Sequence, residues 1–161
     1  MFNLHAYTLV HVAISLIGIA SGLVVAAGFL SAKRLDTATW FFLSTTALTS
    51  LTGFGFPFTH VGPAHVIGAL SLAVLAVAIF ARYGARLAGP WRWTYVVTAM
   101  LALYFNAFVL VVQSFQKAPA LHALAPTQSE PPFAIAQGIV LLVFIVATVL
   151  AVRGFKPTGV A

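Results

Sequence analysis

Cysteine is absent from the sequence, and charged residues are scarce. The lack of thiols excludes disulfide frameworks, thiolate metal sites, iron–sulfur clusters and covalent c-type haem attachment. Charged side chains make up only 6% of the 161 residues, whereas an ordinary soluble domain carries about a quarter. Any cofactor would therefore be held by ligands other than cysteine, and the chain is too poor in charge for a soluble globular domain.

Long apolar runs dominate the chain instead, since 61% of its residues are hydrophobic. A helix needs about 20 apolar residues to cross a hydrocarbon core roughly 30 Å thick. We expect an all-α fold, a helical bundle in a single transmembrane domain covering residues 1–161. Five transmembrane helices are predicted, at about 8–30, 39–56, 64–82, 93–115 and 132–152. No Lys or Arg precedes the first run, which contains no clear small-residue cleavage site, so we expect it to be retained rather than removed as a signal peptide.

The basic residues predict the orientation of these spans. Five spans place seven of the eight Lys and Arg residues on one side: Lys33, Arg34, Arg82, Arg86, Arg92, Arg153 and Lys156. Lys117 alone lies on the opposite side. Because short cationic loops stay in the cytoplasm, the N-terminus is predicted outside and the C-terminus inside. This topology accounts for the net charge of +6, and we expect no binding of nucleic acid.

The same topology places all five histidines on the outer side: His5, His11, His60, His65 and His122. Two of them occupy parallel positions in successive helical hairpins. His11 opens the first span and His65 opens the third, and a tryptophan follows each at a similar interval, Trp40 after 29 residues and Trp93 after 28. If the two hairpins are a repeat, His11 and His65 lie at equivalent depths in the membrane.

The first hypothesis for these histidines is a b-type haem between the first and third spans, with His11 and His65 as axial ligands. Neutral imidazole is a good ligand for haem iron. Candidates for the hydrogen bonds that orient such ligands are Gln113, Gln137, Tyr7 and Asn106. A site of this kind indicates a small membrane protein for redox chemistry or electron transfer.

The second hypothesis is a copper or zinc site at the outer face, built from three or four of His5, His11, His60, His65 and His122. Imidazole suits both metals, and three protein ligands leave one position open. The spacings of six residues from His5 to His11 and five from His60 to His65 match no compact metal-binding motif. The ligands would have to converge from separate loops.

The third hypothesis is that the histidines are polar residues at the membrane interface that cap helices and bond to carbonyl groups. The protein is then a non-catalytic accessory subunit that binds partner helices. Gly18 and Gly22 form a GxxxG pair in the first span, which permits close approach of another helix. This face is a candidate interface for a homo-oligomer or a larger membrane complex, although close packing of helices is the favoured interpretation of the two glycines.

Hydrolytic chemistry by a pair of carboxylates is disfavoured. Asp36 and Glu130 are the only acidic residues, and the predicted topology places them on opposite sides of the membrane. The sequence also lacks the GxSxG motif of a serine nucleophile.

Four segments in the last two-thirds of the chain carry a resemblance: TGFGFPF, ARYGARLAGPWRW, ALYFNAFVLVVQSF and LAPTQSEPPFAIAQ. In these segments the chain resembles small multi-pass inner-membrane proteins of bacteria. The resemblance implies residence in a bacterial inner membrane, and it transfers no catalytic or ligand-binding residues.

Overall fold

The computed structural model describes residues 3–57 and 63–156, and every element within these ranges is a helix. The prediction of an all-α fold is therefore confirmed. The elements are α1 (Leu4–Leu30), α2 (Asp36–Gly53), α3 (Pro63–Ile79), the π-helical turn η1 (Phe80–Gly84), α4 (Trp91–Lys117), α5 (Pro119–Leu124) and α6 (Pro131–Gly154). Each of the five predicted spans corresponds to one long helix, and α5 is a short helix within the predicted fourth loop.

Four of the described helical segments are long and apolar enough to cross a membrane: α1, α3 with η1 from Ala64 to Gly84, α4 and α6. The chain is therefore a membrane protein. The helix α2 falls outside this set because eight of its 18 residues are Ser or Thr. Length and hydropathy thus support four of the five predicted spans.

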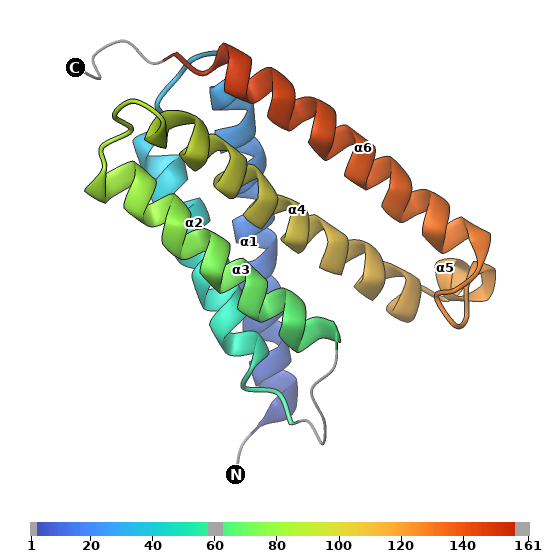
Figure 1. Ribbon diagram of the computed structural model, residues 1–161. Coiled ribbons are helices and arrows are strands. Elements are labelled where there is room, and N and C mark those ends of the chain that lie inside the picture. The colour runs from blue at the N-terminus through green and yellow to red at the C-terminus, as the bar shows by residue number, and fades with distance from the viewer. Residues whose placement is uncertain (1–2, 58–62, 157–161) are drawn as a thin grey trace.

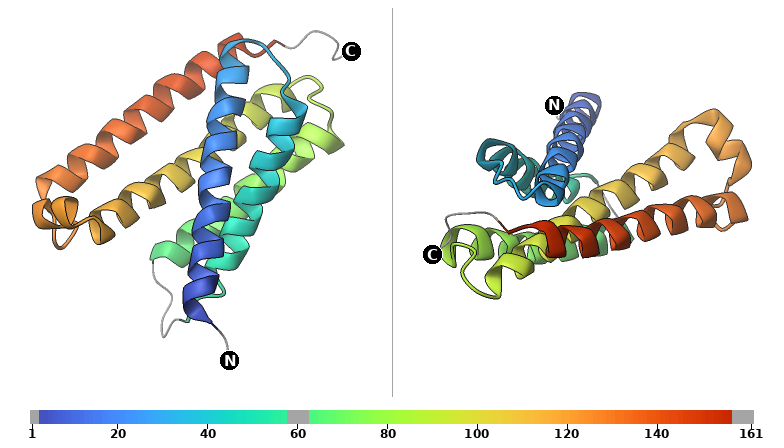
Figure 2. Two further views of the ribbon diagram at one scale, coloured as in Figure 1. Left: turned by 180° about the vertical axis from the view of Figure 1, so that it is seen from behind. Right: turned by 90° about the horizontal axis from the view of Figure 1, so that it is seen from above.

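The helices form two layers (Figures 1 and 2). The antiparallel hairpin of α1 and α2 makes one layer, and α3, α4 and α6 lie side by side in the other. The helix α4 is central, because it packs against α3, α6 and α1. The layers lie close together where α1 and α6 end and α2 and α4 begin. Toward the other end α4 and α6 spread away from α1, while α3 stays against α2 through the Ser50–Ser71 hydrogen bond and the Phe54–His65 ring contact.

Several hydroxyl groups of α2 are satisfied within the protein, which helps a polar helix to fit this bundle, although Thr49 Oγ1 is buried with no hydrogen-bond partner among the described residues. Ser44 Oγ donates to the Trp40 carbonyl at 2.6 Å, and Thr52 Oγ1 donates to the Leu48 carbonyl at 2.7 Å. Ser50 Oγ donates across to Ser71 Oγ of α3 at 3.0 Å. Bonds to the preceding turn and to a neighbouring helix lower the cost of placing hydroxyls in an apolar environment.

Gly18 and Gly22 are buried where the two layers cross, within this chain. A Cβ atom at Gly22 would lie 2.5 Å from Leu103 Cδ1 of α4 and 2.8 Å from Phe42 Cδ2 of α2. The glycines are therefore needed for close packing inside the chain. The predicted use of this face for a partner chain is corrected, because α2 and α4 already cover it.

Candidate functional site

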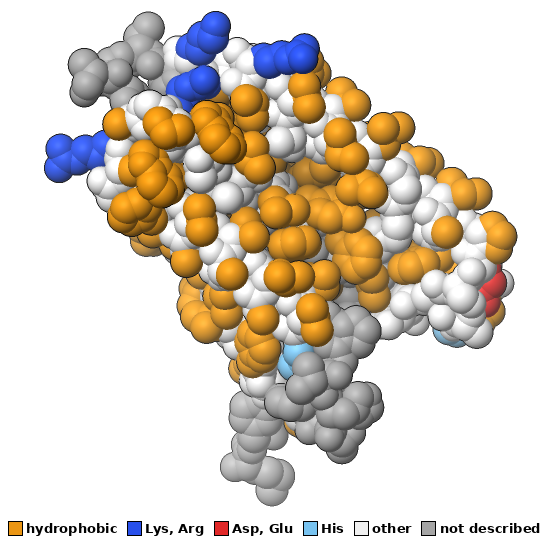
Figure 3. Space-filling view, in the orientation of Figure 1, with side chains coloured by type: hydrophobic (Ala, Val, Ile, Leu, Met, Phe, Trp, Pro, Cys, Tyr) orange, Lys and Arg blue, Asp and Glu red, His pale blue; other side chains and the backbone are white. Residues whose placement is uncertain are grey.

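Lys and Arg side chains gather at the end of the molecule where the layers converge (Figure 3). One of them, Arg82, is not on the surface. It lies in the π-helical turn η1, where the Ala85 N–H donates to the Phe80 carbonyl five residues back. Only 2% of the Arg82 side chain is exposed, and its Nη2 donates to Asp36 Oδ1 at the start of α2. Isolated π-helical turns often occur at functional sites, which makes this residue a candidate.

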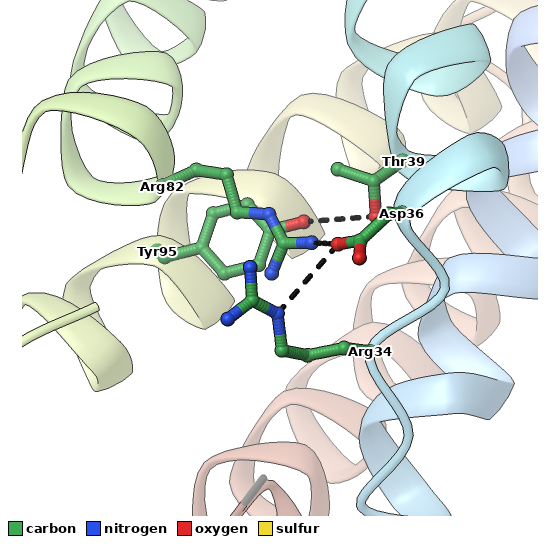
Figure 4. A network of polar contacts seen from close by, with 5 residues as sticks. All are labelled: Arg34, Asp36, Thr39, Arg82 and Tyr95. Carbon is green, nitrogen blue, oxygen red and sulfur yellow. Dashed lines mark hydrogen bonds and ion pairs between the residues drawn. The ribbon is translucent and has the colours of Figure 1, made fainter. Parts of the chain in front are cut away.

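Arg82 is the centre of a polar cluster that joins three elements (Figure 4). We call Arg34, Asp36, Thr39, Arg82 and Tyr95 the Arg82 cluster. The guanidinium lies 5.4 Å from the centroid of the Tyr95 ring of α4, within the range of a cation–π interaction. The Tyr95 hydroxyl donates to Thr39 Oγ1 at 3.4 Å, and Arg34 Nε lies 3.6 Å from Asp36 Oδ1. The cluster ties α2, η1 and α4 together.

The two partners of the ion pair are exposed to very different extents. The Asp36 side chain is 69% exposed and therefore well hydrated, whereas Arg82 is buried. Among the described residues, Arg82 Nε has no hydrogen-bond partner. Because a guanidinium does not lose its proton in proteins, Arg82 stays charged and depends on Asp36 as its counterion. With Arg34 included, the cluster carries one net positive charge.

His11, the first predicted haem ligand, lies in the first half of α1, at the other end of that helix from the Arg82 cluster. His11 Nδ1 is 2.8 Å from Thr52 Oγ1 of α2, and its ring meets Phe56 edge to face at 5.1 Å. The Thr52 hydroxyl already donates to the Leu48 carbonyl, so the proton in the contact comes from His11 Nδ1. This hydrogen-bond pattern favours a hydrogen on Nδ1, and Nε2 takes no part in the contact with Thr52. Tyr7 reinforces the contact by donating to the Thr52 carbonyl at 2.6 Å.

His65 lies on the other layer and contacts a different aromatic side chain. Its ring is 5.9 Å from Phe54 at the end of α2. The helix α1 packs against α2, α4 and α6, while α3 packs against α2 and α4. His11 and His65 are thus held on separate helices that both pack against α2, and the geometry gives the predicted haem between α1 and α3 no support.

The other predicted ligands are dispersed. His5 is exposed in the first turn of α1, His122 is exposed on α5, and His60 lies outside the described residues. Within residues 3–57 and 63–156, no group of three or more His, Asp or Glu side chains could hold a metal ion. The copper or zinc hypothesis therefore has no support from the described part of the chain.

The two predicted glutamines lie on α4 and α6, not on the helices that carry His11 and His65. Gln113 is exposed on α4. Gln137 Nε2 donates to the Phe108 carbonyl at 3.2 Å and so joins α6 to α4. Asn106 has a similar role across the layers, since its Nδ2 donates to Thr46 Oγ1 at 3.2 Å. These amides bridge helices.

The Arg82 cluster was missed by sequence reasoning. The sequence places Asp36 on the side of seven basic residues, which makes an ion pair probable there but does not identify the partner. Comparisons of the chain with protein-family models, with curated proteins and with solved structures gave no match.

Proposed function

We propose that this chain is a non-catalytic accessory subunit of a membrane complex, and that α6 is the helix that binds a partner. The observation that carries the proposal is the exposure of α6. Ala151 is its only fully buried residue, although its mean hydropathy of 2.8 is the highest of the four membrane-capable helices. The polar groups described above join the helices of this chain to one another, whereas α6 contributes a large apolar surface.

The exposed surface of α6 includes the kind of face that membrane helices use for contact. Ala134 and Gly138 are exposed one turn apart, and Leu141 and Ile145 continue the same face. A Cβ atom at Gly138 would meet nothing within 4 Å. Small residues separated by one turn let two helix backbones approach closely, and helix association in lipid depends on such packing.

The proposal includes five spans in a bacterial inner membrane, with the N-terminus outside. The fifth span is α2, which packs antiparallel beside the membrane-capable helix α1 in one hairpin. This pairing supports the proposal that α2 also crosses the membrane. A helix of 18 residues is about 27 Å long, so α2 reaches across most of the depth that α1 spans. The gathering of Lys and Arg at one end supports the orientation.

Native gel electrophoresis of mildly solubilised membranes tests the partner-binding face. The wild-type chain should migrate as a complex larger than the monomer, and Gly138→Leu should shift it to the monomer position. The matched control is Ala76→Leu on α3, which also enlarges an exposed small residue and should leave the complex intact. A wild-type monomer, or a complex that survives Gly138→Leu, would contradict the proposal.

One observation favours the competing proposal of a histidine-bound cofactor for redox chemistry or metal handling. A hydrogen bond from Nδ1–H orients many ligand histidines, and His11 is placed to make one to Thr52 while its Nε2 takes no part in that contact. Absorption spectra of oxidised and reduced protein, with metal analysis of the same sample, decide between the proposals. A Soret band or stoichiometric metal that is lost in His11→Ala would establish the cofactor. Absence of both from protein produced with haem and metals in supply would eliminate it.

A further inference from the structure

A shallow, largely open groove of about 700 Å³ lies on the surface of the α1–α2 hairpin. Ile17, Ala20 and Val24 of α1 form one wall, and Ala38 and Phe41 of α2 contribute the other. The groove ends at Arg34, in the segment between the two helices. It is separate from the exposed face of α6 on which the proposed function rests.

The groove is apolar along its length and polar only at its mouth. Ser21 is the one hydroxyl residue on the α1 wall, and its Oγ donates to the Ile17 carbonyl at 2.6 Å, so it offers no free proton to a ligand. Arg34, Asp36 and Thr37 lie together at the mouth. An occupant of matching chemistry has an apolar tail and a polar head.

The net charge at the mouth of the groove is positive, so the polar head of a matching ligand is anionic. Arg34 and Arg82 share the single carboxylate of Asp36, so one net positive charge is left at the mouth. The Arg34 side chain is 40% exposed, and its Nη atoms have no hydrogen-bond partner among the described residues. Lys33, the preceding residue, is also exposed. A phosphate head matches an arginine of this kind because guanidinium donors pair well with phosphate oxygens.

The position of the groove on a membrane-capable helix indicates which apolar tail a ligand would have. Ile17 and Val24 are about half exposed on a helix that is long and apolar enough to span a membrane. Their separation of seven positions corresponds to about 10 Å of helix, which is part of the depth of one leaflet. A molecule that enters the groove from this side comes from the lipid acyl chains.

We propose that the α1–α2 groove binds an anionic phospholipid, with one acyl chain against Ala20 and Phe41 and the phosphate at Arg34. The positive mouth then lies at the level of the headgroups on the side where basic residues gather. Lipid binding of this kind depends on an apolar surface and a positive charge in the same place, and the described groove provides both.

Native mass spectrometry of the detergent-purified chain tests the site, with phosphatidylglycerol and phosphatidylcholine as probes. The wild-type chain should retain phosphatidylglycerol and not phosphatidylcholine. Arg34→Gln should weaken phosphatidylglycerol binding about fivefold, the effect of one basic residue near an anionic headgroup. Ala20→Leu should weaken it at least as much, because the larger side chain fills the groove.

Two matched variants distinguish the groove from general attraction to a basic surface. Arg86→Gln removes an exposed charge outside the groove, and Ala13→Leu enlarges an exposed residue of α1 outside it. Both should bind phosphatidylglycerol as the wild type does. Equal weakening by Arg34→Gln and Arg86→Gln, or unchanged binding by Ala20→Leu, would overturn the proposal. Circular dichroism of each variant verifies folding, since all four positions are exposed.

Discussion

At the scale of single residues, Arg82 and Asp36 form an ion pair with unequal partners. Removing one partner of a buried pair is destabilising mainly because the other charge is left buried without a counterion. Here only the arginine is buried, so the two possible truncations differ. Loss of Asp36 leaves the buried guanidinium of Arg82 without a counterion. Loss of Arg82 leaves the Asp36 carboxylate, which water already solvates.

We therefore predict that Asp36→Ala lowers the free energy of unfolding by roughly 3 kcal/mol, and that Arg82→Met lowers it by about 1 kcal/mol. The double variant should be more stable than Asp36→Ala alone, because the unpaired charge is gone. Denaturant unfolding in detergent micelles, followed by circular dichroism, measures these differences. Arg34→Gln serves as the control and should change stability by less than about 0.5 kcal/mol, because that ion pair is exposed. Equal effects of Asp36→Ala and Arg82→Met on the free energy of unfolding would refute this explanation of the ion pair.

Glycine positions provide a second contrast between residues. Gly22→Ala should destabilise the protein by about 1–3 kcal/mol, because buried Leu103 and Phe42 leave no room for the added methyl group. Gly138→Ala is the matched control, since the space around Gly138 is open, and it should be neutral or slightly stabilising. Thermal unfolding of both variants measures the contrast. A stable Gly22→Ala variant would mean that the layers can separate at their crossing.

At the scale of elements, the apolar runs located the helices correctly and their ends less well. The second span was predicted at 39–56, whereas α2 begins at Asp36 and ends at Gly53. The predicted bounds leave Asp36 in the loop before the second span, but an acidic side chain is favourable in the first turn of a helix. The segment between the predicted fourth and fifth spans contains the short helix α5, and Pro119 occupies its first position, where the missing N–H is not needed.

The start of α6 gives a prediction about pH. Partial desolvation raises the pKa of the Glu130 carboxyl, but hydrogen bonds from the Thr127 hydroxyl and from backbone N–H groups, including those of Thr127 and Ser129, outweigh it and lower the pKa. The folded loop thus favours the carboxylate. Its contribution to stability is complete above the unfolded pKa of about 4.3 and is lost as the pH falls through the lower folded value.

The backbone amide shifts of Thr127 and Ser129 should therefore titrate with a midpoint below that of an ordinary glutamate. Nuclear magnetic resonance of the labelled protein in micelles measures the midpoint. Glu130→Gln should remove the titration from both amides. A midpoint at or above the ordinary value would show that these hydrogen bonds do not favour the charged form.

The polar contacts between elements could not be predicted in the same way as the helices. Hydropathy locates a helix along the chain but does not specify its rotation about its own axis once all sides are apolar. That rotation turns Gly18 and Gly22 inward and places His11 against Thr52 rather than toward His65. The hydrogen bond from Ser50 to Ser71 likewise depends on packing that the sequence pattern does not encode.

At the scale of the whole molecule, the absence of cysteine allows a direct test of the five-span topology. Single-cysteine variants need no prior removal of native thiols. In sealed, right-side-out membranes, we expect an impermeant maleimide to label Pro57→Cys and Ala123→Cys but not Ser31→Cys or Ala88→Cys. These four sites are exposed and flank successive helices.

Permeabilised membranes are the control, in which all four variants should react. Labelling of Ser31→Cys and Pro57→Cys from the same side would show that α2 does not cross the membrane, which contradicts the five-span arrangement. The reverse pattern of labelling at all four sites would keep the five spans and overturn the orientation.

The divergence of the two layers has a consequence for the surrounding bilayer. Because α4 and α6 spread away from α1 toward the end opposite the basic residues, the described helices fan out at that end, and in a bilayer crossed by the five proposed spans they would occupy a larger cross-section in one leaflet than in the other. Such a wedge displaces unequal numbers of lipids from the two leaflets, and it relieves lateral stress where the bilayer bends toward the narrow end. We therefore expect the protein to enrich in curved regions of the membrane, with its basic end on the concave side.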